Sequence, residues 1–310
     1  MVKVSTLLMA AGAASVAIAA PATTVEKIEK RAAPGQADID TVILNYALTL
    51  EHLENAFYRD ALPSAEAFKK AGYHPWIHER FVEIGGHEKS HVDYLTKALG
   101  DKATKECKYN FGVTGPKSFI ATSQLLEGVG VSAYLGAAAN ITNPAYLTAA
   151  GSILTTEARH SSWVQSSAAL SDPAGSPYDT PTNFNQTYSL AAPLITSCPD
   201  SNPALPVKAF PAASFAKAPT KLGQSVTVKS DKLQQGQKLG FIGGAGAISF
   251  ADINNGKATL PKEVTWGRTY AIIVKGDAKT ITDENTVAGP IAFDILPGPK
   301  EAATFYKNSN

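Results

Sequence analysis

The sequence predicts a mainly α fold, a four-helix bundle that is followed by a small antiparallel β-sandwich. Between residues 37 and 170, apolar residues recur with a helical period in four long segments that Pro and Gly separate. Between residues 207 and 300, short β-prone runs alternate with Gly, Asn, Asp and Pro turns. A content of 44% hydrophobic and 18% charged residues is typical of a globular chain. The net charge of +1 gives no electrostatic reason to expect nucleic acid or an anionic membrane as a partner.

Residues 1–20 have the features of a secretory signal peptide. Lys3 precedes an apolar, alanine-rich stretch that is too short to span a bilayer and that ends in small residues. Lys30 and Arg31 then precede Ala32, which gives residues 21–31 the appearance of a propeptide that ends at a dibasic site. An exposed basic pair without a role is the alternative. We therefore expect a secreted protein, extracellular or in the cell wall, without a membrane span.

Each of the four expected helices is bounded by residues that start or stop helices. Their ranges are about 39–62, before Pro63; 75–99, before Gly100; 116–139, after Gly115; and 144–167, after Asn143. A longer connection separates the second helix from the third. Such a crossover between two helical hairpins is expected in a bundle of this kind.

The remaining chain predicts a linker and the sandwich. Residues 171–206 are rich in Pro, Ser, Asn and Asp, and we expect one short helix near residues 188–195. Secretion favours a disulfide between Cys107 and Cys198, which would hold this linker against the bundle. Asn140 and Asn185 begin Asn-x-Thr sequences and are candidate glycosylation sites. The expected strands are residues 225–229, 238–242, 247–250, 270–275 and 291–295, a region without histidine or cysteine.

Residues 87–91, His-Glu-Lys-Ser-His, fit two kinds of metal site. As H-E-x-x-H, they would bind zinc through two histidines one helical turn apart, with Glu88 as the base of a metalloprotease. As Glu88-x-x-His91 alone, they match the carboxylate and histidine that one helix of a bundle gives to a two-metal site. Glu88 and His91 lie on the apolar seam of the second helix, whereas His87 lies off that seam.

The fourth helix repeats only the second of these patterns. Glu157 and His160 lie at the centre of its apolar stripe, and no histidine precedes Glu157. A zinc protease needs one ion with an open position, so it would leave this duplication unexplained.

The first and third helices add matching glutamates. Glu51 precedes Tyr58 by seven residues, and Glu127 precedes Tyr134 by seven, so each pair shares a helix face. The chain thus alternates glutamate helices with E-x-x-H helices, which is the ligand pattern of ferritin-like two-metal carboxylate proteins. Glu54 is a candidate auxiliary ligand on the same face, with a supporting group or a solvated end as alternatives. The predicted ligands are Glu51, Glu88, His91, Glu127, Glu157 and His160.

Electrostatics favours two metal ions at this pattern. Burying four carboxylates without partners costs several kcal/mol each, against a typical stability of roughly 5–15 kcal/mol. Two divalent cations neutralise the four charges, and the mixed nitrogen and oxygen ligands suit iron or manganese. Gly128 and Gly130 each cost about 1 kcal/mol in a helix, which is expected where a site needs room. Tyr58 and Tyr134 are candidate catalytic residues, with core aromatics as the alternative, and the other histidines are expected at the surface or behind the ligands.

Several segments resemble a known family. They are residues 48–59 (LTLEHLENAFYR), 86–91 (GHEKSH), 157–160 (EARH), 188–193 (YSLAAP) and 197–206 (SCPDSNPALP). Over residues 37–210 the chain resembles the secreted ferritin-like proteins of fungi, described as stress-response or late sexual development proteins and related to plant desiccation-related proteins. The resemblance implies a mainly α, ferritin-like four-helix bundle, an extracellular location and the six ligands above, but no particular reaction.

Two functions of different class follow. The first is a secreted two-metal protein that reacts with oxygen or peroxide through iron or manganese, and that is an oxidoreductase if it turns over. The second is a non-enzymatic structural or surface-binding protein, with the bundle as a scaffold and cell-wall or matrix contact through the C-terminal domain. A ferritin-type storage cage is less favoured, because the sandwich and linker would have to fit around a closed shell.

Overall fold

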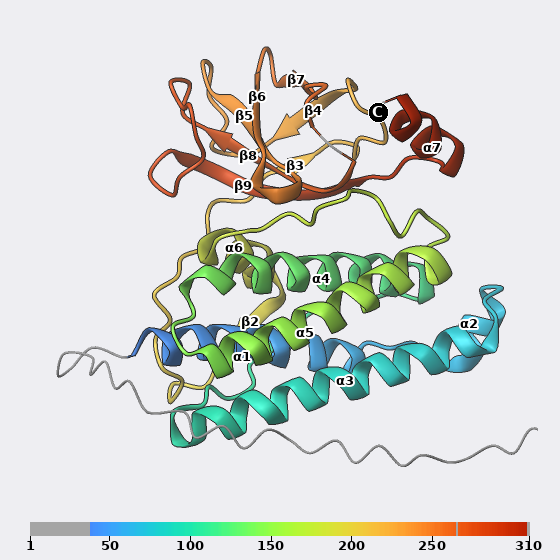
Figure 1. Cartoon of the computed structure of the whole chain (residues 1–310), viewed down its shortest axis with the longest axis vertical. Coiled ribbons are helices and arrows are strands. Elements are labelled where there is room, and N and C mark those ends of the chain that lie inside the picture. The colour runs from blue at the N-terminus through green and yellow to red at the C-terminus, as the bar shows by residue number, and fades with distance from the viewer. Residues whose placement is uncertain (1–37, 265, 309–310) are drawn as a thin grey trace, which may run out of the picture. The chain divides into compact units, whose positions relative to one another are not determined.

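A computed structural model of the chain describes residues 38–264 and 266–308, and the predicted signal peptide and propeptide lie outside the described residues. Four long helices form the bundle (Figure 1): α1 (Ile39–Asp60), α3 (Pro75–Leu99), α4 (Pro116–Ala137) and α5 (Pro144–Trp163). α1 packs along α3 and α4 along α5, as two helical hairpins. The predicted fold class, a ferritin-like helical bundle followed by antiparallel β-sheets, is confirmed.

Local sequence sets the helix ends. The ring of His74 accepts a hydrogen bond from the Trp76 amide at the start of α3, and Gly100 takes a φ of 56° after its end. Asn143 caps α5 through its side-chain oxygen, 2.9 Å from the Ala145 amide nitrogen. α1 ends two residues before its predicted end, and the chain then forms α2 (Ala65–Lys70), a short helix that periodicity did not indicate. After α5 the chain continues as a π-helix, Val164–Ala168.

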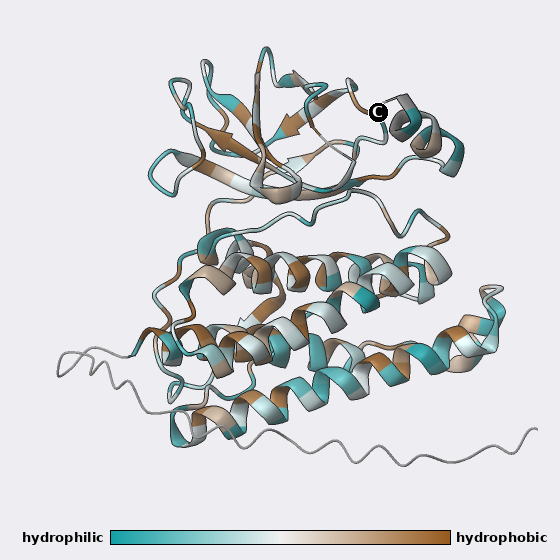
Figure 2. Cartoon of the chain, in the orientation of Figure 1, coloured by the Kyte–Doolittle hydropathy of each residue, from teal (hydrophilic) through white to brown (hydrophobic). Residues whose placement is uncertain are grey.

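Two apolar clusters fill the bundle, and Figure 2 shows hydrophobic and hydrophilic residues alternating along its helices. One cluster gathers aromatic side chains, including Phe57 of α1 and Phe81 of α3. The other contains Leu48 of α1 and Leu95 of α3. Glu51 and Glu88 fall between these positions along both helices, so a polar layer separates two apolar layers.

The connections lie against the bundle. Cys107 and Cys198 form a disulfide beside the short strand pair β1 (Lys108–Tyr109) and β2 (Ile195–Ser197). The predicted helix near residues 188–195 begins earlier, as α6 (Phe184–Ala191), because Asn183 and Gln186 form a capping box at its start. Asn140 is exposed, whereas the amide of Asn185 donates to Asp283 at 2.6 Å. A glycan on Asn185 would therefore displace a hydrogen bond of the folded chain.

The C-terminal part contains two antiparallel sheets. The first has the order β3 (Ser214–Phe215), β4 (Ser225–Lys229), β7 (Lys257–Thr259). The second has the order β6 (Ile248–Asp252), β5 (Lys238–Ile242), β8 (Gly267–Val274), β9 (Thr286–Ile295). β9 begins five residues before its predicted start, because a register shift opposite Ala271 and Ile273 accommodates Pro290 within the strand. α7 (Pro299–Asn308) follows.

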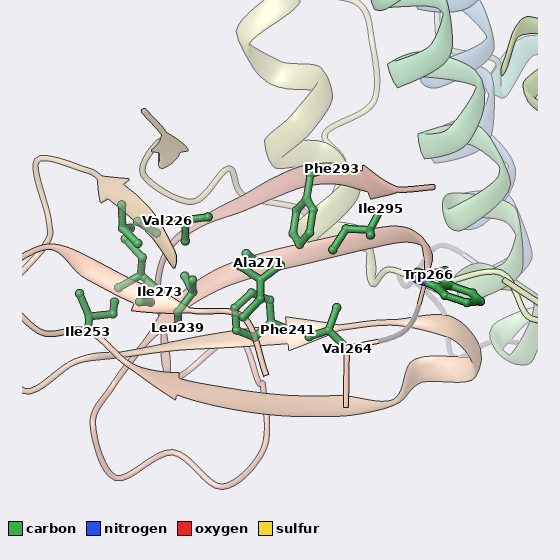
Figure 3. Close-up of a cluster of buried hydrophobic side chains, with 14 residues drawn as sticks. Val226, Leu239, Phe241, Ile253, Val264, Trp266, Ala271, Ile273, Phe293 and Ile295 are labelled. Carbon is green, nitrogen blue, oxygen red and sulfur yellow. The ribbon is translucent and has the colours of Figure 1, made fainter. Parts of the chain in front are cut away.

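The core of the sandwich is apolar (Figure 3). Phe241, Phe293 and Ile273 point into the space between strands, together with Leu239 and Val226. Burial alternates along β4, where Val226 and Val228 are buried between exposed neighbours, so one face of this strand lies on the apolar core.

The opposite face of the four-stranded sheet contacts α4. The Tyr270 hydroxyl donates to Ser132 Oγ at 2.7 Å, and Arg268 donates to the Gln124 carbonyl oxygen at 3.0 Å. Arg268 also forms an ion pair with Asp294 at 2.7 Å. A Cβ atom on Gly128 would lie 2.6 Å from Arg268 Nη2, so this glycine makes room for the arginine. Within the described range, no helix has the length and hydropathy of a membrane span.

Candidate metal centre

The six predicted ligands meet in the middle of the bundle. Their donor atoms form two groups, in each of which the atoms lie within 4.8 Å of one another. The first group contains Glu51, Glu88, His91 and Glu157, and the second contains Glu88, Glu127, Glu157 and His160. Glu88 and Glu157 belong to both groups. The arrangement therefore offers two adjacent cation positions that share two carboxylates.

Within the groups, imidazole nitrogens face carboxylate oxygens. His91 Nδ1 lies 3.2 Å from Glu51 Oε2, 3.2 Å from Glu88 Oε2 and 3.3 Å from Glu157 Oε1. His160 Nδ1 lies 3.0 Å from Glu88 Oε1 and 3.2 Å from Glu127 Oε2. The two oxygens of Glu88 thus face different groups, as a bridging carboxylate requires.

Burial and hydrogen bonding fit cations at these positions. The four glutamates of the two groups, Glu51, Glu88, Glu127 and Glu157, are each 0% exposed. Glu88 and Glu157 are the shared carboxylates, and Glu51 and Glu127 are the terminal ones. Both oxygens of Glu157, one oxygen each of Glu88 and Glu127, and Nδ1 of His160 have no hydrogen-bond partner among the residues that the structure describes. Unpaired buried polar atoms are costly, and converging ones can be satisfied by a shared cation. Four carboxylates and two imidazoles are a donor set that could hold two divalent metal ions.

The two tyrosines orient the terminal glutamates across the bundle. Tyr58 of α1 donates to Glu127 Oε1 of α4, and Tyr134 of α4 donates to Glu51 Oε1 of α1 at 2.5 Å. In each glutamate the other oxygen, Oε2, faces its group. Tyr58 also lies 2.7 Å from Ser123 Oγ. Sequence spacing correctly put each tyrosine on the ligand face but did not show that it serves the opposite helix.

His87 contacts a predicted ligand and belongs to neither group. Its Nδ1 lies 2.8 Å from His160 Nε2, and the two rings stack at 5.1 Å. Histidine ligands commonly donate their second ring nitrogen to such a partner. The H-E-x-x-H hypothesis needs His87 and His91 on one ion, and the structure does not bring them together. His52 is held apart from the centre by its contact with the Thr104 carbonyl oxygen at 3.1 Å.

Burial and mutual charge shift the pKa values of the ligands. Burial lowers the pKa of His91, but ion pairs with Glu157, Glu51 and Glu88 outweigh it and raise the pKa to about 12. The pKa of His160 rises to about 10, because Glu127 and Glu88 outweigh the effect of burial. Burial raises the pKa of Glu51 to about 7. Metal binding to such histidines must therefore displace protons.

Glu88 differs from the other glutamates. Burial alone would raise its pKa, but the imidazoles of His160 and His91 beside its oxygens lower it to about 2. Burial, followed by the charges of Glu88 and Glu127, holds the pKa of Glu157 well above its ordinary value. Of the two shared carboxylates, Glu88 is thus the one whose ionised form the neighbouring histidines stabilise without a metal ion.

Glu54 lies beside the centre but in neither group. It is 5% exposed, and burial followed by the charge of Glu157 raises its pKa well above the ordinary value. A Cβ atom on Gly130 would lie 3.1 Å from Glu54 Oε1 and 3.0 Å from Glu157 Oε2. Gly130 therefore makes room for carboxylates, whereas Gly128 makes room for Arg268.

Two small apolar cavities flank the centre. One, of about 30 Å³, is lined by residues that include Leu50, Tyr134 and Ile153. The other, of about 20 Å³, is lined by Leu53, Leu126, Glu54 and Gly130 among others. Each has about the volume of one water molecule, so only a very small molecule fits beside the ligands.

Comparison with known proteins agrees with this geometry. Residues 39–169 match the ferritin-like domain family. Over 244 residues the chain is 26% identical to Protein rds1 of the yeast Schizosaccharomyces pombe. The matched region covers 78% of this chain and 55% of that protein. The chain thus spans about half the length of this curated relative. The family match supports a ferritin-like domain over residues 39–169.

Proposed function

We propose that the chain is a secreted ferritin-like protein that binds two iron or manganese ions and uses them in redox chemistry with oxygen or peroxide, in stress response or development. The observation that carries this proposal is the pair of four-residue groups that share Glu88 and Glu157. Buried oxygens that have no hydrogen-bond partner among the described residues support it further.

The proposed roles of the ligands follow from their places. Glu88 and Glu157 would hold both ions, Glu51 and His91 one, and Glu127 and His160 the other. Bound ions of a redox metal would supply the electron exchange with oxygen or peroxide. Tyr58 and Tyr134 would keep Glu127 and Glu51 oriented, and each phenol stands one hydrogen bond from a ligand. That distance also suits a phenol that donates a hydrogen atom or an electron to the centre.

The surroundings support a small and uncharged reactant. The ligands are buried, and the cavity of about 30 Å³ beside Tyr134 is lined by apolar side chains such as Leu50 and Ile153. The apolar lining favours dioxygen over the more polar hydrogen peroxide. Exclusion of bulk water strengthens every electrostatic interaction within the centre.

Extracellular location remains part of the proposal. The predicted signal peptide supports it, and so does the disulfide between Cys107 and Cys198, because disulfides persist in oxidising compartments. The predicted processing after Arg31 would start the mature chain near Ala32.

A metal-free scaffold is the second candidate. Protonated His91 and His160 would partly neutralise the carboxylates through ion pairs of 3.0–3.3 Å, so the cluster could serve structure alone. The function would then lie in cell-wall or matrix contact through the C-terminal domain. Stability that is indifferent to a chelator would favour this candidate.

The test is the metal content of the mature secreted protein. We would reconstitute it separately with iron, manganese and zinc and count the ions by mass spectrometry. The Glu88→Gln/Glu157→Gln variant removes both shared carboxylates at constant volume, and Glu66→Gln/Glu79→Gln makes the same change at exposed positions. We expect about two iron or manganese ions per chain in the wild type and the control, and none in the first variant. Wild-type protein that binds no metal would contradict the proposal.

A further inference from the structure

The twofold pattern of the bundle breaks at one position next to the metal centre. Glu51 and Glu127 are equivalent, and the residue three positions later is Glu54 on α1 but Gly130 on α4. One half of the bundle therefore carries an additional buried carboxylate where the other half carries only a hydrogen atom. If two ions bind, this difference places an additional carboxylate beside one of them, although the remaining ligands are equivalent for both.

The carboxylate of Glu54 reaches the space that Gly130 leaves. A Cβ atom added at residue 130 would lie 3.1 Å from Glu54 Oε1 and 3.0 Å from Glu157 Oε2. Oxygens from α1 and α5 thus border the same small volume beside α4. Any larger residue at position 130 would press on both carboxylates.

Neither of these two oxygens has a compensating partner in the described chain. Glu54 is 5% exposed and forms no hydrogen bond or ion pair with any residue that the structure describes. Glu157 Oε2 likewise has no hydrogen-bond partner among them. Two buried carboxylates that face a common volume repel one another unless a proton or a cation lies between them.

We propose that Glu54 is a further metal ligand, which binds an ion also held by Glu157 and makes the two metal positions unequal. This inference rests on the two-metal function proposed above. Glu54 belongs to neither group of converging atoms, so its carboxylate would have to move toward them when the ion enters. The ion that gains Glu54 has one more oxygen ligand and one more negative charge around it. Such a position favours a hard cation such as manganese over a softer one.

A titration with manganese chloride tests this inference. Mature protein freed of metal is titrated with Mn²⁺, and the free ion is counted by electron paramagnetic resonance. We expect two bound Mn²⁺ per chain in the wild type and in the Glu79→Gln control, whose side chain is exposed on α3. In Glu54→Gln, one ion keeps its affinity and the other binds at least about tenfold more weakly, as for the loss of a supporting or ligating group.

A second variant probes the same space from the opposite helix. Gly130→Ala retains Glu54 but places a methyl group 3.0–3.1 Å from the oxygens of Glu157 and Glu54. We expect it to weaken the same Mn²⁺. Urea denaturation of the metal-free variants excludes a purely structural role, because Glu54→Gln should match or exceed the wild type in stability when it loses only a ligand.

The outcomes separate this inference from the function on which it rests. Two Mn²⁺ ions bound by Glu54→Gln within twofold of the wild-type affinities would overturn the role of Glu54 and leave the two-metal centre intact. Wild-type protein that binds no Mn²⁺ under these conditions would overturn both. A loss of stability in metal-free Glu54→Gln with unchanged Mn²⁺ affinities would assign Glu54 to structure alone.

Discussion

Tyr58 donates its hydroxyl hydrogen to Glu127 on α4 and not to Glu51, which lies two turns earlier on its own helix. Tyr134 makes the reciprocal bond from α4 to Glu51 on α1. These crossed bonds join the two helical hairpins at the level of the ligands. They also fix one oxygen of each terminal glutamate, so that the other oxygen faces the candidate metal centre.

The crossed bonds predict a specific pattern of energetic coupling. Tyr58→Phe leaves Glu127 Oε1 and Ser123 without a buried partner and should lower the free energy of unfolding by about 1–3 kcal/mol. A double-mutant cycle with Glu127→Gln should give a coupling energy of at least about 1 kcal/mol, measured by urea denaturation of metal-free protein. The matched cycle of Tyr58→Phe with Glu51→Gln should give less than about 0.5 kcal/mol. Equal couplings in the two cycles would contradict the crossed arrangement.

His87 should influence metal binding without touching the metal. His87→Ala removes the ring that pairs with His160 Nε2, so it should weaken one bound ion by about 10–100-fold. Thr156→Ala is the matched control, because Thr156 precedes Glu157 as His87 precedes Glu88 and makes its hydrogen bonds with Ser152 and Arg159. The measurement is competition for manganese against a chelating dye. An unchanged affinity in His87→Ala would show that the stacked pair has no effect on the centre.

The shifted pKa values predict that the free energy of unfolding changes with pH in opposite directions with and without metal. The pKa of Glu51 is raised from 4.5 to about 7, so its contribution to stability is complete below pH 4.5 and is lost as the pH rises through about 7. His160, raised from 6.5 to about 10, loses its contribution between those values as the pH rises. Chelated protein should therefore become less stable between pH 5 and pH 8, by up to about 1.4 kcal/mol per pH unit for each extra proton held.

Metal-loaded protein should show the reverse slope over the same range. Ligands must lose their protons to bind an ion, so metal affinity rises with pH and adds stability through binding. Glu88 has the opposite sign in the metal-free protein, but its window lies between about 2 and 4.5 and outside this range. Urea denaturation at three pH values, with chelator or with manganese, measures both slopes. Parallel slopes would argue against metal binding by these groups.

Gly128 leaves space in α4 for Arg268 of β8, so a substitution at this position tests the contact between helix and sheet. Gly128→Ala places a Cβ 2.6 Å from Arg268 Nη2, and the ion pair with Asp294 prevents this buried guanidinium from moving away cheaply. We expect a loss of about 1–3 kcal/mol, the usual cost of overpacking. Gly86→Ala in α3 meets no atom within 4 Å and should gain up to about 1 kcal/mol from helix propensity. Thermal denaturation should separate the two variants, and equal midpoints would contradict the contact.

The sequence predicted those features that periodicity and spacing encode. Residues 75–99 are the clearest case, because Pro75 and Gly100 mark both ends of α3 and its apolar seam carries Glu88 and His91 inward. In the larger sheet, β5 matches its predicted range, and the other three strands were found in part. The assignment of the six ligands to metal stays a prediction, although the structure brings all six together.

Other features depend on contacts that no local pattern reveals. α2 and the strands of two or three residues are too short for a periodic signal. The bond between His87 and His160 joins residues 73 positions apart, and the bond between Tyr58 and Glu127 joins residues 69 positions apart. The reason for Gly128 is an arginine on β8, far away in the sequence, which helix propensity alone cannot identify. The difference between Glu54 and Gly130 could have been found from the sequence, because the two residues occupy equivalent positions in the twofold pattern.

The disulfide between Cys107 and Cys198 gives the connection from bundle to sandwich a second covalent path. The chain between α5 and α6 includes Leu170 and Tyr178, which are 84% and 64% exposed and open to proteases. A single cut there severs the backbone between the helices and the sheets. Because Cys198 lies after the cut and Cys107 before it, the two fragments remain one molecule until a reductant acts. A chain cut at this place therefore retains both parts in one piece.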